Sequence, residues 1–212
     1  WWFTKSLRQT FQSLMKKLIL FFVIVFFSSS NAFASKFGSK EEVVTALKKS
    51  GNIVFIRHAY APRINNKFEP DDFYSGSLKK KDCSVQRDLD NRGLAQAKII
   101  GNLFKENNIQ IDKILTSIYC RCFKTANEIS SDYEISKMII SVGRGNVSKK
   151  KKQLKKIRKF IEKWDGKKNL VIVSHFNVIN PLFEKSLLSI SSGEVVVSDK
   201  DFKILANWKV PY

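Results

Sequence analysis

Residues 52–59 read NIVFIRHA, in which four apolar residues lead directly into an arginine and a histidine. Residues 169–175 read NLVIVSH and repeat the pattern, with an apolar run that ends at a second histidine. The chain contains only these two histidines, His58 and His175. Short apolar runs are typical of strands buried in a parallel sheet, and ligands of such sheets bind beyond the carboxyl ends of the strands. The sequence therefore predicts both histidines at the functional edge of a sheet.

Strands and helices alternate on either side of these two strands, which we place at 52–56 and 170–174. Ser39 and Glu42 form a capping box that starts a helix to about residue 49, and Asp90 can cap a second helix. The other expected elements are a loop over 60–88, helices over about 91–107, 121–131 and 177–188, strands at 113–117 and 138–142, and a hairpin at 194–198 and 202–208. The alternation predicts an α/β fold, a three-layer α/β/α sandwich with a mainly parallel central sheet and a C-terminal hairpin.

The first 34 residues have the features of a secretory signal peptide. Met15 is followed by two lysines, ten apolar residues at 18–27 and a small-x-small site that ends at Ala34. This arrangement is typical of an export signal, and ten apolar residues are too few to span a bilayer as a helix. We expect residues 1–34 to be an upstream segment and a signal peptide that starts at Met15 and is cleaved after Ala34. One secreted or periplasmic domain would then occupy 35–212; an uncleaved N-terminal anchor is the alternative.

The chain is strongly basic, with a formal charge of +19. Residues 1–34 hold four cations and no anions, so residues 35–212 carry about +15. Four lysines open a helix whose apolar residues recur at helical spacing; they are Lys149, Lys150, Lys151 and Lys152. A solvated basic face is one interpretation, and contact with an anionic surface is the other. An exported chain without a nucleic-acid motif is not expected to bind nucleic acid, and no stable membrane span is expected.

Three further motifs accompany the Arg57-His58-Ala59 motif. Residues 89–97 read LDNRGLAQA, residues 117–126 read SIYCRCFKTA, and residues 171–175 read VIVSH. In order and spacing they resemble the histidine phosphatase superfamily, which has the phosphoglycerate mutase-like fold. The family's counterparts are a Leu-Thr-x-x-Gly-x-x-Gln-Ala helix start, a Ser-x-x-x-Arg-x-x-x-Thr-Ala block and a strand that ends at a distal histidine. The resemblance covers about residues 51–182.

The resemblance implies a metal-independent phosphomonoester hydrolase that forms a phosphohistidine on His58, and the residue types fit this chemistry. Arg57 and Arg121 can bind phosphate oxygens bidentately. Their charges should lower the pKa of His58 and keep it neutral for attack on phosphorus, while His175 stabilises the transition state. Arg63 is a further candidate for phosphate binding. No cluster of metal ligands stands out in the sequence, so no metal and no cofactor are expected.

The proton donor is left open. Mutase-like members of the family carry a glutamate after the Thr-Ala pair, and the corresponding stretch of this chain lacks that motif. Asp82 and Glu134 are the candidates that we put first, and Asp71 and Glu194 are the others. The missing glutamate favours a phosphatase over a mutase. It is also the one feature that favours the alternative, an exported and catalytically inactive relative that binds phosphorylated ligands.

The expected partner is a small phosphorylated substrate. A signal peptide together with a cysteine before the Gln-Ala helix resembles the periplasmic phosphatases that act on heptose phosphates of the lipopolysaccharide core. This likeness points to an envelope sugar phosphate. The loop over 60–82, where substrate contacts are expected, is not similar enough to transfer specificity.

Three cysteines remain after the expected cleavage: Cys83, Cys120 and Cys122. An oxidising compartment favours disulfides, and a bridge between Cys120 and Cys122 would strain the backbone around Arg121. The loop that carries Cys83 should pass near the turn that carries Arg121. We therefore predict a Cys83–Cys120 disulfide with Cys122 as a buried thiol; three ordinary buried thiols are the alternative.

Overall fold

The computed structural model describes residues 38–63, 82–141, 147–183 and 189–212. The expected signal peptide lies outside these residues, and so does most of the expected loop, including Asp71. Within the described ranges, no helix combines the length and the apolar character that crossing a membrane requires.

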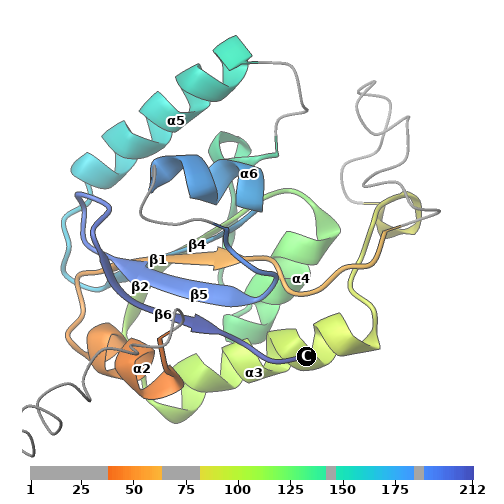
Figure 1. Cartoon of the computed structure of the whole chain (residues 1–212), viewed down its shortest axis with the longest axis horizontal. Helices are drawn as coiled ribbons and strands as arrows, with labels where there is room; N and C mark the ends of the chain where they lie inside the picture. Colours follow the sequence, from red (N-terminus) through yellow and green to blue (C-terminus); the bar gives the residue numbers. More distant parts are fainter. Residues whose placement is uncertain (1–37, 64–81, 142–146, 184–188) are drawn as a thin grey trace, which may run out of the picture. The chain divides into compact units, whose positions relative to one another are not determined.

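A six-stranded sheet forms the centre of the described domain (Figure 1). Its strands lie in the order β3-β2-β4-β1-β5-β6. The first four in this order are parallel to one another, and β5 and β6 are antiparallel and close the sheet as a hairpin. The strands are β1 (Ile53–Arg57), β2 (Ile111–Thr116), β3 (Glu134–Ile135), β4 (Asn169–Ser174), β5 (Glu194–Ser198) and β6 (Ile204–Lys209).

Helices cover both faces of the sheet and make three layers (Figure 1). One apolar core lies between the sheet and α2 (Lys40–Lys48), α3 (Asn91–Glu106) and α4 (Cys120–Ile129). A second core lies on the opposite face, against α5 (Val147–Glu162) and α6 (Phe176–Ile179). Successive residues of β1 enter opposite cores, because side chains alternate along a strand. Short 3₁₀ helices complete the described elements: η2 (Cys83–Val85), η3 (Lys137–Ile139) and η4 (Asn180–Leu182).

The expected sandwich, parallel sheet and hairpin are confirmed, and so are the two helix caps. Ser39 and Glu42 form a complete capping box at the start of α2. Asp90 accepts a hydrogen bond from the backbone N–H of Gly93, at 2.9 Å, and so caps α3. Ser39 and Asp90 thus each accept a hydrogen bond from a backbone N–H that has no intrahelical partner in the first turn of the helix.

The predicted strand at 138–142 is wrong. The third parallel strand is the short β3, and residues 137–139 form η3, in which Ser136 accepts a hydrogen bond from the backbone N–H of Met138. Ile139 is fully buried in the core beneath α5. The apolar residues of this stretch are therefore buried against a helix and do not pair as a strand. In short runs, the periodicity of apolar residues does not distinguish these two cases.

Two other boundaries differ from the predictions for local reasons. The helix expected over 177–188 ends as α6 at Ile179 and continues as η4, whose second residue is Pro181. Proline lacks the N–H that an α-helix needs; residues 184–188 are outside the described ranges. Strand β6 begins at Ile204 and not at 202, because Phe202 has a positive φ of 63° in the hairpin turn.

Candidate active site

The two histidines meet at the carboxyl edge of the sheet, as predicted. Strands β1 and β4 are parallel neighbours, and Arg57 lies opposite Ser174 in their register. The residues that follow are therefore His58 and His175, whose ring centroids lie 5.4 Å apart. The backbone N–H of His58 donates to the carbonyl of Ser174 at 2.9 Å, which joins the two strand ends. Both rings are almost fully buried.

The environment of His58 selects one tautomer. Its Nδ1 lies 2.8 Å from the carbonyl oxygen of Ala59. A carbonyl only accepts, so Nδ1 carries the proton and Nε2 carries the lone pair. The Nε–H of Arg121 points to that lone pair at 3.2 Å. Burial, followed by the charge of Arg121, holds the pKa of His58 well below its usual value of 6.5. His58 is thus neutral at neutral pH, and its lone pair lies on Nε2.

His175 is held by residues of the 117–126 motif. Its Nε2 lies 2.9 Å from the hydroxyl of Ser117 and 3.5 Å from the sulfur of Cys122. The ring of Tyr119 meets the imidazole edge-on, with centroids 4.8 Å apart. Burial and the charge of Arg121 are the main causes that keep the pKa of His175 well below 6.5. The motif thus supplies both the site arginine and the pocket of the distal histidine.

Arg57 and Arg121 bring two cations to the same edge; Arg121 is buried and Arg57 is half-buried. Arg121 lies in the first turn of α4, and its Nη1 donates to the carbonyl of Arg87 at 3.3 Å. Arg57 ends β1, and its Nη1 donates to the carbonyl of Ile190 at 2.8 Å. Burial and the nearby charge of Arg121 lower the pKa of Arg57. Among the described residues, the buried Nε of Arg57 has no hydrogen-bond acceptor, so a donor is available for an anion.

Thr125 connects two of the sequence motifs. Its hydroxyl accepts a hydrogen bond from the backbone N–H of Ala59 at 3.0 Å and donates to the carbonyl of Arg121 at 2.6 Å. The segment that follows His58 is therefore fixed to the helix that carries Arg121. This role of Thr125 could not be predicted from the sequence, because nothing in its local pattern points to a partner 66 residues away.

Gln96 performs a similar task from α3. Its side-chain oxygen accepts from the backbone N–H of Tyr60 at 2.8 Å, and its amide donates to the carbonyls of Ser192 and Val210. Gly93, one turn earlier, allows the close approach: a Cβ atom there would lie 1.9 Å from the carbonyl oxygen of Tyr60. The Gln-Ala motif is therefore structural, and it holds the segment that follows His58.

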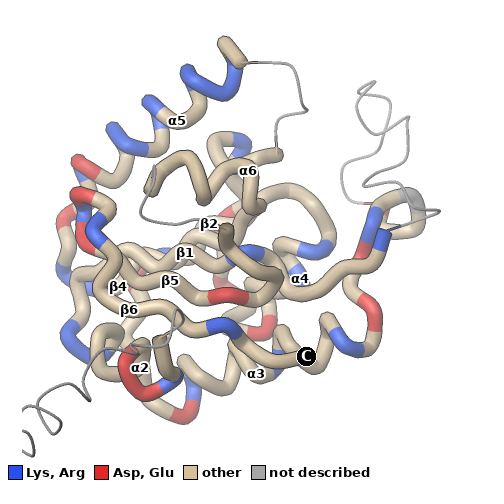
Figure 2. Tube along the Cα trace, viewed as in Figure 1, with Lys and Arg blue, Asp and Glu red and all other residues tan. Residues whose placement is uncertain are grey.

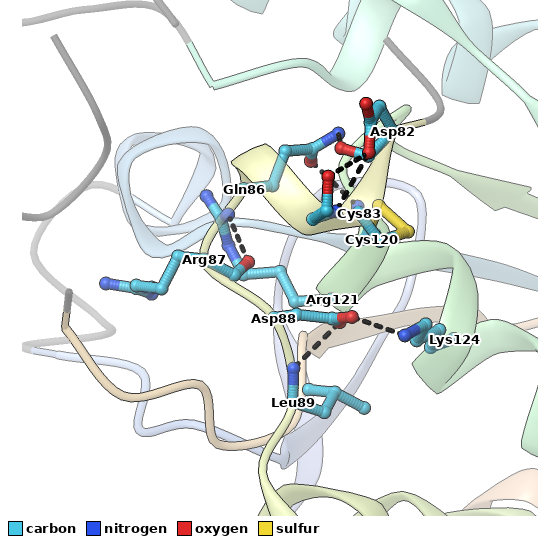
Figure 3. The surroundings of a disulfide bond; sticks show 10 residues. Asp82, Cys83, Gln86, Arg87, Asp88, Leu89, Cys120, Arg121 and Lys124 are labelled. Carbon is cyan, nitrogen blue, oxygen red and sulfur yellow. Dashed lines mark hydrogen bonds and ion pairs between the residues drawn. A yellow bond between two sulfur atoms is a disulfide. The ribbon is translucent and has the colours of Figure 1, made fainter. Parts of the chain in front are cut away.

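The disulfide joins Cys83 to Cys120, the pair chosen from the sequence, with Cα atoms 5.7 Å apart (Figure 3). Cys122 is buried and lies outside the bridge. Two further contacts join the same segments: the side-chain oxygen of Gln86 accepts from the backbone N–H of Cys120 at 3.1 Å, and Lys124 forms an ion pair with Asp88. Figure 3 shows these contacts on both sides of Arg121. Residues 82–90 are thus fastened to the first turns of α4.

Loss of this disulfide should weaken both the fold and the site. The bridge spans 37 residues, and chain-entropy arithmetic gives a loss of about 3–4 kcal/mol in the free energy of unfolding on its removal. We expect urea unfolding to show this loss for the double variant Cys83→Ser/Cys120→Ser, together with a lower kcat/KM because Arg121 is less firmly placed. Reductant should destabilise the wild type and leave the double variant unchanged. An equal urea midpoint for the wild type with and without reductant would contradict the prediction.

The remaining candidates lie in different surroundings. Arg63 is exposed, at the end of the described segment after His58. Asp82 is also exposed and caps η2 by accepting from Ser84. Glu134 lies exposed on the edge strand β3, which β2 and β4 separate from β1, and it pairs with Lys113 at 3.0 Å. Glu194 is buried, and its charge acts on Arg57.

Arg87 was not singled out from the sequence. It lies between η2 and α3, is only 7% exposed, and offers its carbonyl to Arg121. Its charge also contributes to the lowered pKa of His175. Only its position in the sequence could have pointed to Arg87: it lies between Cys83, which was expected to bridge to Cys120, and the start of the Gln-Ala helix.

Both histidines should be neutral across the usual titration range. Because their pKa values are lowered, we expect neither imidazole C–H signal of the folded protein to show an NMR midpoint near 6.5. The unfolded chain takes up protons near pH 6.5 that the folded chain does not, so the free energy of unfolding should decrease as the pH falls below 6.5. Both signals of the urea-unfolded chain, which serves as the control, should titrate near 6.5. A normal midpoint for His58 in the folded protein would contradict the assigned tautomer and charge.

No family model and no curated protein matches the sequence. Solved structures do match the fold. The protein histidine phosphatase SixA in complex with tungstate has a TM-score of 0.51 at 14% identity, over 76% of this chain and 96% of that one. A candidate phosphohistidine phosphatase SixA from Agrobacterium tumefaciens has a TM-score of 0.52 at 18% identity, over 74% and 97%.

A third similar structure is a candidate alpha-ribazole-5′-phosphate phosphatase from Escherichia coli. It has a TM-score of 0.50 at 15% identity and covers 76% of this chain and 96% of its own. Identities this low show a common fold alone. The described elements thus form an architecture that these three proteins share over nearly their whole length.

Proposed function

We propose that this chain, which has the phosphoglycerate mutase-like fold of the histidine phosphatases, is a phosphomonoester hydrolase with His58 as its nucleophile. The observation that carries the proposal is the environment of that one ring. His58 is buried, neutral and protonated on Nδ1, so that its Nε2 lone pair lies beside the guanidinium of Arg121. The tungstate in the similar SixA structure is a tetrahedral oxyanion like phosphate, which supports an oxyanion as the ligand.

Substrate binding would free the nucleophile. The Nε–H of Arg121 donates to the lone pair that must attack phosphorus. Phosphate oxygens are charged and accept hydrogen bonds more strongly than a neutral imidazole nitrogen does. When a phosphate binds, the guanidinium turns to its oxygens together with the available donors of Arg57, and the Nε2 lone pair is released. Nε2 of His58 can therefore attack phosphorus only when the substrate is bound.

The reaction then follows two displacements at phosphorus. Nε2 of His58 forms a bond to phosphorus as the bond to the leaving-group oxygen breaks, and that oxygen takes up a proton. Water next attacks the phosphohistidine, which releases inorganic phosphate and restores neutral His58. Arg57, Arg121 and His175 lie around the phosphoryl group and stabilise the negative charge of both transition states.

Turnover of p-nitrophenyl phosphate in the presence of EDTA tests the proposal. We expect phosphate release to continue under chelation, since the groups proposed to act are side chains of the protein. Vanadate should inhibit, because it adopts the trigonal-bipyramidal geometry of phosphorus under attack. A strict requirement for Mg²⁺ or Zn²⁺ would contradict the mechanism. Binding of vanadate without any turnover would instead favour the alternative, a catalytically inactive protein that binds phosphorylated ligands.

We also propose that the enzyme acts in the cell envelope, on a phosphorylated sugar. The signal-peptide features of residues 1–34 support an exported protein, and the Cys83–Cys120 disulfide supports an oxidising compartment. A mature protein whose N-terminal sequence begins at Ser35 would agree with export and cleavage, and full-length protein in the cytoplasm would contradict it.

A basic helix face could hold such an enzyme against an anionic surface. Helix α5 carries Lys149, Lys150, Lys151 and Lys152, three of them exposed, and Figure 2 shows basic residues along its length. Each such lysine near a charged membrane contributes about 1 kcal/mol of attraction. Sedimentation with anionic vesicles that salt reverses would support this contact, and equal sedimentation with neutral vesicles would contradict it.

A further inference from the structure

Phe176 is an exposed aromatic residue that directly follows His175. Its side chain is 42% exposed, whereas His175 before it is buried and Val178 and Ile179 after it belong to the second apolar core. Single exposed apolar side chains are common on protein surfaces, so the exposure alone indicates nothing. The place of Phe176 is what sets it apart: of the five large apolar side chains that are exposed in the described ranges, it is the one that adjoins a histidine of the site.

Local contacts place the ring of Phe176 beside a side chain expected to bind phosphate. The carbonyl of His175 accepts hydrogen bonds from the backbone N–H groups of Val178 and Ile179, at 3.0 and 2.9 Å, and these bonds fix the first turn of α6. The ring meets the guanidinium of Arg57, whose Cζ lies 5.4 Å from the ring centroid, within the range of a cation–π contact. Arg57 ends β1 and Phe176 follows β4, so this contact joins the ends of two neighbouring strands.

The geometry of the proposed reaction directs the leaving group toward the exposed side of the site. In phosphoryl transfer, the attacking atom and the leaving atom lie roughly in line through phosphorus. His58 is only 2% exposed, so the leaving group lies on the side of phosphorus that faces away from this buried ring. A phosphate held by Arg57 therefore brings its leaving group to the exposed ring that packs against the same guanidinium.

We propose that Phe176 packs against the leaving group of the substrate and favours leaving groups that contain a ring with an apolar face. Ligand sites commonly combine aromatic side chains with a few polar groups that fix the orientation of the ligand. Here the arginines bind the phosphate, and Phe176 contacts the group that carries it. A sugar presents such a face through its C–H groups, and an aromatic ring presents one on either side of its plane. This inference rests on the proposed phosphatase function and names the class of leaving group.

Three phosphate monoesters of primary alcohols test the inference: ethyl phosphate, benzyl phosphate and glucose 6-phosphate. They carry the same charge and the same type of bond to be broken. We expect the wild type to prefer the two that contain a ring. In Phe176→Ala, kcat/KM for these two should fall about 3- to 10-fold more than kcat/KM for ethyl phosphate, the usual effect of losing one aromatic contact. Phe176→Tyr, which keeps the flat ring, should retain the preference.

Leu205→Ala is the matched control. Leu205 is 47% exposed, like Phe176, but it lies on the edge strand β6, so its removal should leave the ratio of kcat/KM values unchanged. The ratio within one variant does not depend on the fraction of folded enzyme. If Phe176→Ala does not fold, Phe176→Leu replaces it, since leucine keeps an apolar side chain without the flat face, and the ratio should again fall.

An equal fall for all three substrates in the Phe176 variant would overturn the inference, because the ring would then act through Arg57 and not on the leaving group. An unchanged ratio would overturn it as well. A fall that is larger for glucose 6-phosphate would support a sugar as the natural leaving group, and one that is larger for benzyl phosphate would support an aromatic group; both agree with the inference. Wild-type enzyme that releases phosphate from none of the three, nor from p-nitrophenyl phosphate, would contradict the phosphatase function instead.

Discussion

The variant His58→Ala is expected to release no phosphate above the uncatalysed rate, in a protein that remains folded. Alanine has no lone pair to attack phosphorus, and within the site no other described side chain occupies the position of Nε2 beside Arg121. The loss should therefore appear in kcat and not only in KM. A pre-steady-state assay measures the loss of kcat. A thermal unfolding midpoint like that of the wild type shows that the variant is folded. Turnover within tenfold of the wild type, in verified folded protein, would mean that another group is the nucleophile.

The variant His175→Ala is expected to lower kcat by about 10²–10³-fold, the usual effect of removing one donor that stabilises transition-state charge. His58 stays in place, so slow turnover through the same intermediate should persist. The measurement is kcat with p-nitrophenyl phosphate at saturating concentration. Ser117→Ala is a matched control: it removes the hydroxyl 2.9 Å from Nε2 of His175 while the ring remains, and it should cost less. A fall confined to KM in His175→Ala would contradict the proposed role.

The features that could be predicted from the sequence are those that local chemistry determines. The apolar runs before His58 and His175 are fully buried neighbouring strands, since a strand in the middle of a parallel sheet is covered on both faces. The caps of α2 and α3 are side chains that bind N–H groups only three residues ahead. Both kinds of feature depend on residues adjacent in the chain.

The features that were missed depend on distant partners. Thr125 and Gln96 hold the loop after His58 through hydrogen bonds that span 66 and 36 residues, and no periodicity marks such bonds. The apolar run before residue 142 gave a false strand because a 3₁₀ turn beneath α5 buries the same residues. Glu134 was chosen as a candidate proton donor by residue type, and the sequence could not show that two strands separate its strand β3 from β1. The backbone around Arg87 is fixed by the Cys83–Cys120 disulfide. The residues next to Arg87 in the sequence do not reveal this.

The most direct test of the account is to trap the covalent intermediate. Enzyme mixed with ³²P-labelled substrate is quenched in alkali within milliseconds, since phosphohistidine survives base and is cleaved by acid, and the labelled peptide is identified by mass spectrometry. The account predicts one acid-labile phosphate on the peptide that contains His58, absent in His58→Ala and retained in His175→Ala. Label on any other residue, or turnover with no labelled enzyme at any time, would contradict it.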